Sequence, residues 1–231
     1  MDPKIFMIGN AHLDPAWLWR WQEGYAEIKA TFRSALDRMK EFDGYIFTAA
    51  GAGYYQWVEE NEPAMFEEIR QRVAEGRWVL AGGWWLQPDC NLPCGESFAR
   101  HGLYGQQYFL SRFGKRALFG YNVDSFGHNG ALPQLLTQCG MDSYVMMRPE
   151  QHEKALSSDT FLWEGIDGAR VLTYRIPTGY CTSVDASDFD RKREFFQKKL
   201  QSERASKMFF YGVGNHGGGP TSALLHRLED W

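Results

Sequence analysis

Cysteine is scarce in this chain, and no charge of one sign dominates it. The four cysteines, Cys90, Cys94, Cys139 and Cys181, are too few and too scattered among 231 residues for a disulfide framework. Cys90 and Cys94 have a spacing that zinc sites use, but no second pair follows, so we expect buried free thiols. With 25 basic and 29 acidic residues the formal net charge is −4, and no basic stripe marks a nucleic-acid-binding surface.

A long hydrophobic run is also missing. The apolar run Ile5–Ile8 follows four residues that include Lys4 and is too short for a signal peptide or a membrane span. We therefore expect a cytoplasmic protein that binds neither nucleic acid nor a membrane. Aromatic residues, in contrast, reach 16% with nine Trp. Most of these rings are expected in the core, and the others to stack on apolar faces of a ligand such as a sugar.

The hydrophobic pattern predicts an α/β fold. Short apolar runs alternate with segments of helical period, which is typical of a parallel sheet with crossover helices. Seven strands are expected, near residues 4–10, 45–50, 78–82, 117–123, 143–148, 170–176 and 208–213. Helices are expected between them, one with the buried face Tyr25, Ile28, Phe32, Leu36 and Met39, and others near 55–74, 96–113, 130–139 and 188–202.

Seven such units in 231 residues favour a seven-stranded parallel (β/α) barrel over an open sheet, which stays the alternative. We expect residues 1–231 to form a single domain. A helix is expected to begin at Thr221 and Ser222 and to be still unfinished at Trp231. This pattern indicates a fragment of a longer protein.

Ligands of parallel α/β folds bind at the carboxyl ends of the strands. The first strand runs into His12-Leu13-Asp14, where the spacing of two points both polar side chains the same way on extended backbone. An imidazole nitrogen and a carboxylate oxygen together form half of a zinc-type site. The alternative is a structural pair whose two members satisfy each other.

Asp124 follows the fourth strand and begins a turn that contains Gly127. The alternative role, a cap for the helix after Gly130, would need a shorter separation than six residues. His128 lies closer to that helix and is expected to be structural. Arg148 follows the fifth strand, where a cation beside Asp124 would lower the pKa of the carboxyl and keep it ionised as a nucleophile. An ordinary surface ion pair is the alternative.

The seventh strand runs into a glycine-rich segment, residues 214–221. Such a segment before a helix can cradle a phosphate, which is one interpretation. No Gly-Lys-Ser/Thr follows and the Walker spacing is absent, so the glycines indicate only a close approach of the backbone to some ligand.

Taken together, these motifs resemble the N-terminal catalytic domain of the glycoside hydrolase family 38, the retaining α-mannosidases, in its bacterial type. The resemblance rests on five segments that span nearly the whole chain: His12-x-Asp14-x-x-Trp17, Trp78–Ser97, Asn122–His128, Arg148 and Gly214–Thr221.

The resemblance implies a zinc-dependent hydrolase that cleaves α-mannosidic bonds through a covalent glycosyl-enzyme on Asp124. It implies that His12, Asp14 and Asp124 bind zinc together with a fourth ligand, a His beyond residue 231. It places Trp17, Phe126 and Arg148 in the substrate pocket.

The same resemblance implies a mannose-containing oligosaccharide or glycoside as the partner of the site. It further implies a helical bundle and β-sandwich domains downstream, and a full-length enzyme that is a homo-oligomer. The 231-residue fragment alone is expected to be inactive.

One position departs from the family pattern. The relatives carry an acid/base Asp in the glycine-rich loop where this chain has Asn215, and an amide cannot donate and recover a proton. His216, or an Asp among Asp185, Asp188 and Asp190, is expected in that role, or the acid lies elsewhere. Two alternatives to the family reading stay open. One is a metal-dependent polysaccharide deacetylase, although its H-x-x-x-H motif is absent. The other is a non-catalytic carbohydrate-binding fragment, which Asn215 favours.

Overall fold

The chain divides into two compact units in the computed structural model, which describes residues 2–214 and 217–231. Unit 1 comprises residues 1–48, 76–78 and 178–231, and unit 2 comprises residues 49–75 and 79–177. The single domain expected over residues 1–231 stays a prediction. The boundary of the two units runs through two strands, β2 (Phe47–Ala50) and β3 (Trp78–Ala81).

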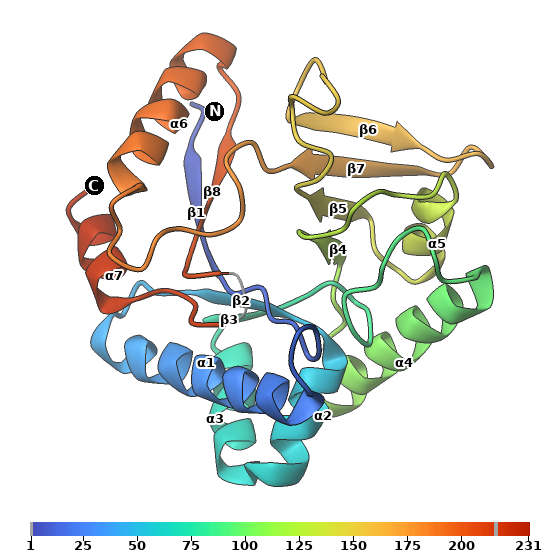
Figure 1. Cartoon of the computed structure of the whole chain (residues 1–231), viewed down its shortest axis with the longest axis vertical. Coiled ribbons are helices and arrows are strands. Elements are labelled where there is room, and N and C mark those ends of the chain that lie inside the picture. Colours follow the sequence, from blue (N-terminus) through green and yellow to red (C-terminus); the bar gives the residue numbers. More distant parts are fainter. Residues whose placement is uncertain (1, 215–216) are drawn as a thin grey trace. The chain divides into compact units, whose positions relative to one another are not determined.

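The first of two four-stranded sheets has the order β3-β2-β1-β8 (Figure 1). Strand β1 (Ile5–Asn10) pairs in parallel with β2 and with β8 (Lys207–Tyr211). The β1–β8 register places Ile5 opposite Lys207 and Gly9 opposite Tyr211. Strands from the two ends of the sequence are therefore direct neighbours.

The second sheet has the order β4-β5-β7-β6. Strands β4 (Phe119–Asn122), β5 (Ser143–Met146) and β7 (Arg170–Arg175) run parallel. Strand β6 (Thr160–Glu164) pairs antiparallel with β7, so it lies at the edge of the sheet. Because β6 and β7 are joined by only five residues, they form a hairpin.

The predicted α/β class with parallel strands is confirmed, and all seven predicted strands are present. The seven-stranded, all-parallel barrel is not shown, because the described residues form eight strands in two sheets and β6 is antiparallel. The signal for β6 was in the sequence. Phe161 and Trp163 alternate with polar or outward-facing positions, and Gly168, with φ of 84°, provides the turn.

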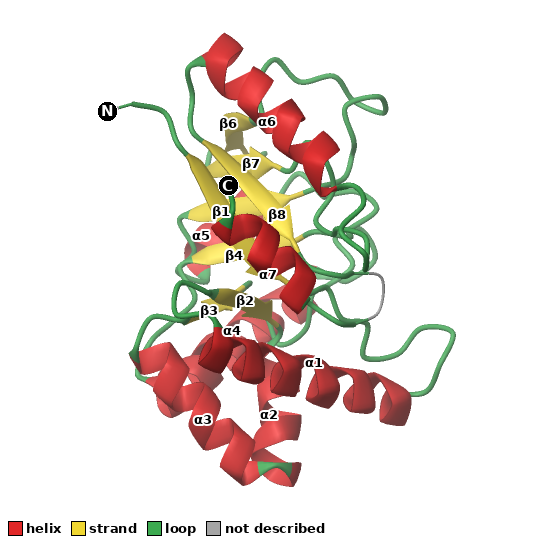
Figure 2. Cartoon of the chain, turned by 90° about the vertical axis from the view of Figure 1, so that its left-hand side faces the viewer, coloured by secondary structure: helices red, strands yellow, loops and turns green. Residues whose placement is uncertain are grey.

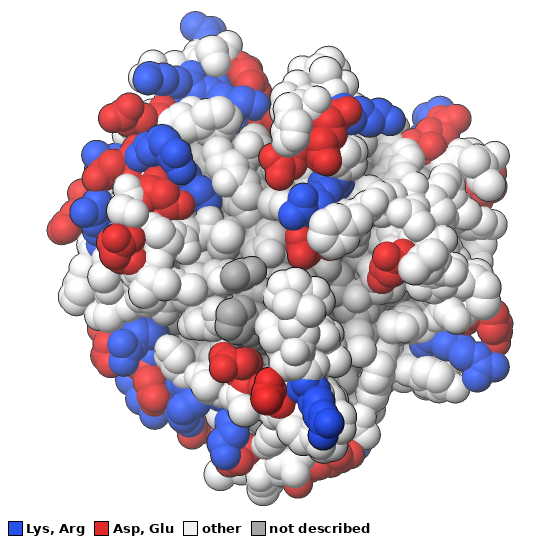
Figure 3. All heavy atoms as spheres, viewed as in Figure 1, with Lys and Arg blue, Asp and Glu red and all other residues white. Residues whose placement is uncertain are grey.

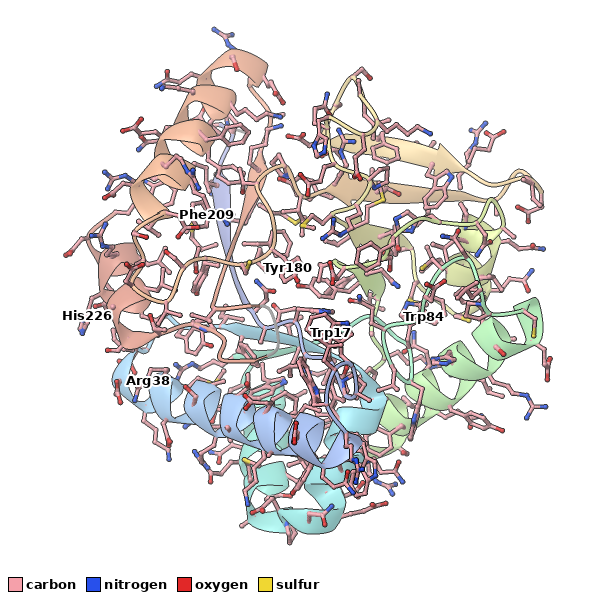
Figure 4. The ribbon with its side chains drawn as sticks, in the orientation of Figure 1. Trp17, Arg38, Trp84, Tyr180, Phe209 and His226 are labelled. Carbon is pink, nitrogen blue, oxygen red and sulfur yellow. The ribbon has the colours of Figure 1, made fainter. Side chains whose placement is uncertain are left out.

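Three helices belong to unit 1: α1 (Trp21–Glu41), α6 (Phe189–Glu203) and α7 (Ser222–Glu229). Four of the five residues of the predicted face of α1 are buried, Tyr25 is partly exposed, and the Phe32 ring packs edge-on to Trp78 at 5.1 Å. Helix α6 packs on β8 through Phe196, whose ring lies 5.2 Å from that of Phe209 (Figure 4). Each fully buried Phe contributes about 1.5–3 kcal/mol relative to an exposed one.

Helix α7 begins as predicted, because the hydroxyl of Thr221 accepts a hydrogen bond from the amide of Leu224 at 3.3 Å. It ends at Glu229, two residues before Trp231, so the expectation of a helix still unfinished at Trp231 is wrong. The ring of Trp231 packs against Phe209 at 5.4 Å.

Unit 2 carries four helices, α2 (Ala52–Asn61), α3 (Pro63–Ala74), α4 (Gly95–Phe113) and α5 (Leu132–Gln138). The single helix expected over 55–74 is two helices, because Pro63 has no amide hydrogen to continue α2 and instead occupies the first turn of α3. Figure 2 shows these helices in red and the strands in yellow. The core of unit 2 includes Trp84, Phe98, Tyr144 and Met146.

None of the described helices is both long and apolar enough to cross a membrane. Charges of both signs are interspersed over α6, at the upper left of Figure 3. Several of them form ion pairs along the helix or with α7, including Arg227 with Asp190 at 2.7 Å.

Candidate functional site

The end of β1 in unit 1 is fixed by a buried amide. The side-chain amide of Asn10 donates to the carbonyl oxygens of Tyr180 at 2.9 Å and Tyr211 at 3.1 Å. Gly212 follows β8 with φ of 133°, and a Cβ there would lie 2.1 Å from the Asn10 carbonyl oxygen. Only glycine fits this close approach, which brings the ends of β1 and β8 together.

His12 and Asp14 come directly after this fixed strand end. His12 Nε2 lies 3.3 Å from Asp14 Oδ1, and the two side chains are 8% and 30% exposed. Two donors bound to one tetrahedral ion at about 2.0–2.2 Å lie about 3.3–3.6 Å apart. The observed separation therefore fits a pair that shares a zinc ion. Within either unit, the described residues hold no group of three His, Cys, Asp or Glu side chains placed to bind a metal.

Tyr180 lies against the buried His12. The two ring centroids are 5.2 Å apart at an interplanar angle of 58°, and Tyr180 is 8% exposed (Figure 4). The tyrosine therefore limits the orientations that the imidazole can adopt. Sequence reasoning missed this residue, because no local pattern relates Tyr180 to a position 168 residues earlier.

The segment that carries Tyr180 is held by three side-chain hydrogen bonds to successive carbonyls. Lys192, on α6 and 5% exposed, donates to the carbonyl oxygens of Gly179 and Cys181, while Asn10 donates to that of Tyr180. Burial lowers the pKa of Lys192, and the charge of Asp188 opposes part of that effect. Lys192 stands between Arg191 and Arg193, so no sequence pattern distinguishes it from these two other basic residues of the same helix.

Trp17, three residues beyond Asp14, is 61% exposed. Its ring meets that of Trp19 edge-on at 5.2 Å, and the indole nitrogen of Trp19 donates to the carbonyl oxygen of Asp14 at 3.2 Å. Trp17 is thus not a core residue of unit 1, and its ring is open to a ligand. Its role in the substrate pocket stays a prediction.

In unit 2, a buried network holds the end of β4. Asn122, fully buried, donates to the carbonyl oxygen of Pro88 at 3.2 Å and to the hydroxyl of Ser125 at 3.3 Å, and accepts from the indole of Trp84 at 3.1 Å. These bonds fix the turn in which Asp124 lies. Asp124 does not cap α5, whose N-cap is Ala131.

Arg148 and Asp124 form a partly buried ion pair. Arg148 Nε donates to Asp124 Oδ1 at 3.1 Å, with 30% and 22% of the two side chains exposed. The guanidinium carbon of Arg148 also lies 4.6 Å from the centre of the Phe126 ring, and Phe126 is 73% exposed. The structure thus brings together three of the predicted site residues, with the cation fixed by a carboxylate and by a ring face.

His128 holds the backbone of Arg148 in this pair. Its Nε2 donates to the carbonyl oxygen of Arg148 at 2.8 Å, which leaves Nδ1 to accept from the hydroxyl of Tyr144 at 3.1 Å. Burial lowers the pKa of His128, outweighing the hydrogen bond to Arg148 that acts in the other direction. His128 is therefore held neutral in one tautomer, as suits the structural residue expected from the sequence.

The candidates for the general acid divide in two groups. Asn215 and His216 lie outside the described residues. Hydrogen bonds from the amide and hydroxyl of Ser187 lower the pKa of Asp185, and Ser183 does the same for Asp188 against the raising effect of burial. A general acid needs its proton near neutral pH, so these two carboxyls are poorly suited to the role.

The described part of the glycine-rich segment explains its composition. Gly217, Gly218 and Gly219 all have positive φ, at 155°, 111° and 64°. The amide of Gly218 donates to the hydroxyl of Thr31 on α1 at 2.9 Å. Backbone conformation thus accounts for glycine at these three positions without any ligand.

Known proteins resemble this chain over its whole length. Residues 2–231 match the model of the glycosyl hydrolases family 38 N-terminal domain. The chain is 33% identical over 227 residues to α-mannosidase G of Dictyostelium discoideum. The matched region covers 97% of this chain and 21% of that protein. Among solved structures it resembles an α-mannosidase from Enterococcus faecalis V583, with a TM-score of 0.80 and 18% identity over 99% of this chain and 27% of the other.

A more distant fold likeness is to a putative polysaccharide deacetylase from Mycobacterium smegmatis, with a TM-score of 0.62 and 14% identity over the full chain and 84% of the other. These likenesses show a mixed α/β fold with parallel sheets. The chain belongs to glycosyl hydrolase family 38, as its N-terminal domain. It spans about a fifth of the length of the curated α-mannosidases that it matches.

Proposed function

We propose that this chain is the N-terminal catalytic part of a retaining, zinc-dependent α-mannosidase that acts on mannose-containing oligosaccharides or glycosides. The Asp124–Arg148 pair is the observation that carries the proposal, because it supplies a carboxylate fixed in position at the carboxyl end of β4. Family membership supplies the substrate class. A cytoplasmic location and a homo-oligomeric full-length enzyme form part of the same proposal.

Asp124 acts as the nucleophile in this proposal. A lone pair of its carboxylate forms a bond to the anomeric carbon, while the glycosidic oxygen leaves with the bonding pair and takes a proton from the general acid. Arg148 holds the carboxylate in one orientation through a charge-assisted hydrogen bond. Water then releases the sugar, with the acid group acting as base.

His12 and Asp14 are the residues of unit 1 that would hold zinc, together with Asp124 and a His beyond residue 231. When bound, the ion supplies a Lewis-acid anchor for adjacent sugar hydroxyls. Trp17, Phe126 and Arg148 would bind the mannose ring. The acid/base group is assigned to the glycine-rich segment at Asn215 or His216, with His216 the one able to exchange a proton.

Covalent trapping tests this function directly. The full-length enzyme that contains this chain, with zinc added, is incubated with 5-fluoro-α-mannosyl fluoride, whose C5 fluorine slows breakdown of the glycosyl-enzyme, and its peptides are analysed by mass spectrometry. We expect one sugar adduct per chain on the peptide that contains Asp124, and none in Asp124→Asn. Asp142→Asn, at an exposed position, serves as the matched control and should label like the wild type.

A label on another carboxyl would reject Asp124 as the nucleophile. Turnover of an acetylated sugar, with no label and no hydrolysis of α-mannosyl fluoride, would favour the deacetylase alternative. Binding of mannosides with neither label nor turnover would favour a non-catalytic carbohydrate-binding fragment.

A further inference from the structure

The hairpin of β6 and β7 contacts the segment 124–130, which carries the candidate nucleophile. Its turn begins at Gly165, whose carbonyl oxygen accepts a hydrogen bond from the amide of Gly168 at 3.0 Å. The amide of Ile166, the second residue of this turn, donates to the carbonyl oxygen of Gly130 at 3.0 Å. A Cβ at Gly165 would lie 3.2 Å from the same oxygen, so the two backbones approach closely. The turn is thus bonded to the end of the segment 124–130.

The same hairpin contacts this segment a second time, through Trp163. The Trp163 ring meets the His128 ring edge-on, with the centroids 5.8 Å apart and the planes at 81°. It also lies 6.0 Å from the ring of Tyr144, whose hydroxyl donates to His128 Nδ1 at 3.1 Å. The imidazole is therefore held by an indole against its ring and by a phenol at one nitrogen.

From His128 the contacts lead to the carboxylate of Asp124. His128 Nε2 donates to the carbonyl oxygen of Arg148, and Arg148 Nε donates to Asp124 Oδ1 at 3.1 Å. A displaced imidazole would release the backbone of Arg148, and with it the guanidinium that orients the carboxylate. The candidate nucleophile is thus connected to β6 through Trp163, His128 and Arg148.

Strand β6 lies at the edge of its sheet, and among the described strands it pairs with β7 alone (Figure 1). The three parallel strands β4, β5 and β7 pair with one another without it. Leu162 and Glu164 are exposed on the outer face of β6, whereas Trp163 between them points to the opposite face. Pairing of the parallel strands therefore does not depend on the hairpin.

We propose that the β6–β7 hairpin is a clamp that positions the Asp124 carboxylate for attack, with Trp163 and the amide of Ile166 as its positioning groups. A nucleophile reacts rapidly from a near-attack geometry, in which the reacting atoms are about 3–3.5 Å apart and aligned. The clamp limits the movement of the segment 124–130 and so keeps the carboxylate in one position. The inference rests on the proposed function and adds to it a support for the nucleophile that lies outside the parallel strands.

Two matched pairs of variants of the full-length enzyme test the clamp. Ile166→Pro removes the amide hydrogen that bonds to the Gly130 carbonyl and suits the second position of a turn, whereas Ile166→Ala keeps the amide. Trp163→Leu removes the ring that packs on His128, and Trp163→Phe keeps a ring there. With zinc added, kcat and KM are measured for α-mannosyl fluoride, and hydrogen–deuterium exchange is measured for the peptide that contains residues 124–130. Thermal unfolding checks that each variant folds.

We expect faster exchange over residues 124–130 in Ile166→Pro and in Trp163→Leu. Both should lower kcat by about 10–100-fold with little change in KM, because a small displacement of a reacting group slows the chemical step without weakening the binding of substrate. Ile166→Ala should behave like the wild type, and Trp163→Phe should recover most of the loss. A merely structural role would leave kcat of the folded variants unchanged.

Unchanged exchange in Ile166→Pro and Trp163→Leu would overturn the clamp, as would faster exchange with unchanged kcat. Equal losses within each matched pair would also overturn it, because the losses would then depend neither on the amide nor on the ring. A wild type that does not hydrolyse α-mannosyl fluoride would reject the proposed function instead. In that case the exchange alone decides: faster exchange in the two variants supports the clamp, and unchanged exchange overturns it.

Discussion

His128 Nε2 donates a hydrogen bond to the carbonyl oxygen of Arg148 at 2.8 Å, and Arg148 Nε in turn donates to Asp124. The residue that holds the candidate nucleophile is thus itself held by a partly buried imidazole. His128 lies four positions after Asp124, so one loop provides both the carboxylate and the support for its partner. Substitutions of His128 are therefore expected to destabilise unit 2.

Replacing His128 by Phe should lower the free energy of unfolding by about 1–3 kcal/mol, because the Arg148 carbonyl and the Tyr144 hydroxyl both lose a partner. Urea denaturation measures the change. His152→Phe, at a side chain that is 76% exposed, is the control and should change the stability by less than about 0.5 kcal/mol. Equal effects of the two substitutions would show that the buried contacts of His128 contribute nothing.

The same histidine predicts how stability depends on pH. Its pKa in the folded chain lies below the unfolded value of about 6.5, so the unfolded chain binds the proton first as the pH falls. The contribution of neutral His128 is fully present above about pH 6.5 and is lost as the pH falls toward the folded pKa. His101 has a pKa lowered in the same direction by burial and adds to the effect. The free energy of unfolding, measured by urea denaturation between pH 7 and pH 5, should therefore depend less on pH in His128→Phe than in the wild type. The same pH dependence in both would contradict the assignment.

Lys192→Met should destabilise unit 1 by about 1–3 kcal/mol, because the carbonyls of Gly179 and Cys181 lose their buried donor. Lys198→Met on the same helix is the matched control, since Lys198 is 79% exposed. Urea denaturation compares them. A loss confined to Lys192→Met supports the role of Lys192 in holding the Tyr180 segment, and equal losses would assign the effect to the helix alone.

Zinc should raise the unfolding temperature of the chain, and chelation with EDTA should reverse the rise. A free concentration of 100 times the dissociation constant stabilises the folded state by about 2.7 kcal/mol. His12→Ala should abolish the effect, because it removes the imidazole that lies 3.3 Å from Asp14. His152→Ala should keep it. A zinc effect of the same size in both variants would place the bound metal elsewhere.

Cys94 should be the first thiol of the chain to react with iodoacetamide. It is exposed, and hydrogen bonds from the amide and hydroxyl of Ser97 lower its pKa, whereas burial raises the pKa of Cys90 and of Cys139. Since the thiolate is the nucleophile, its reaction should begin at a lower pH than that of an ordinary thiol. Peptide mass spectrometry follows the order, with Cys94→Ser as the control, and faster labelling of Cys90 would contradict the structure.

Local patterns predicted most of the fold. The period of α1 and the apolar runs of the seven predicted strands depend on neighbouring residues, and the structure confirms these elements. Strand β6 was not predicted because its exposed positions Thr160, Leu162 and Glu164 interrupt the apolar run that marks the buried strands. The end of α2 before Pro63 follows from the missing amide hydrogen of proline. The continuous helical period over 55–74 predicted one helix there instead.

Candidate site residues could be named from the sequence where they follow predicted strands, and their roles stay predictions. The positions after β1, β4 and β5 gave His12, Asp14, Asp124 and Arg148 as candidates. The support behind them was not predictable, because Tyr180 and Lys192 reach the β1 end only through contacts between residues far apart in sequence. The sequence around Lys192 also does not show that this lysine is buried while its basic neighbours are exposed.

The pairing of β1 with β8 has a consequence for synthesis on the ribosome. Ile5 and its partner Lys207 are 202 positions apart, and translation adds about 5–20 residues per second. Strand β1 therefore waits about 10–40 s for the neighbour that completes its second edge. During that interval an open strand edge is available to other nascent chains, so expression at lower temperature or with a chaperone that binds strand edges should increase the yield of folded protein.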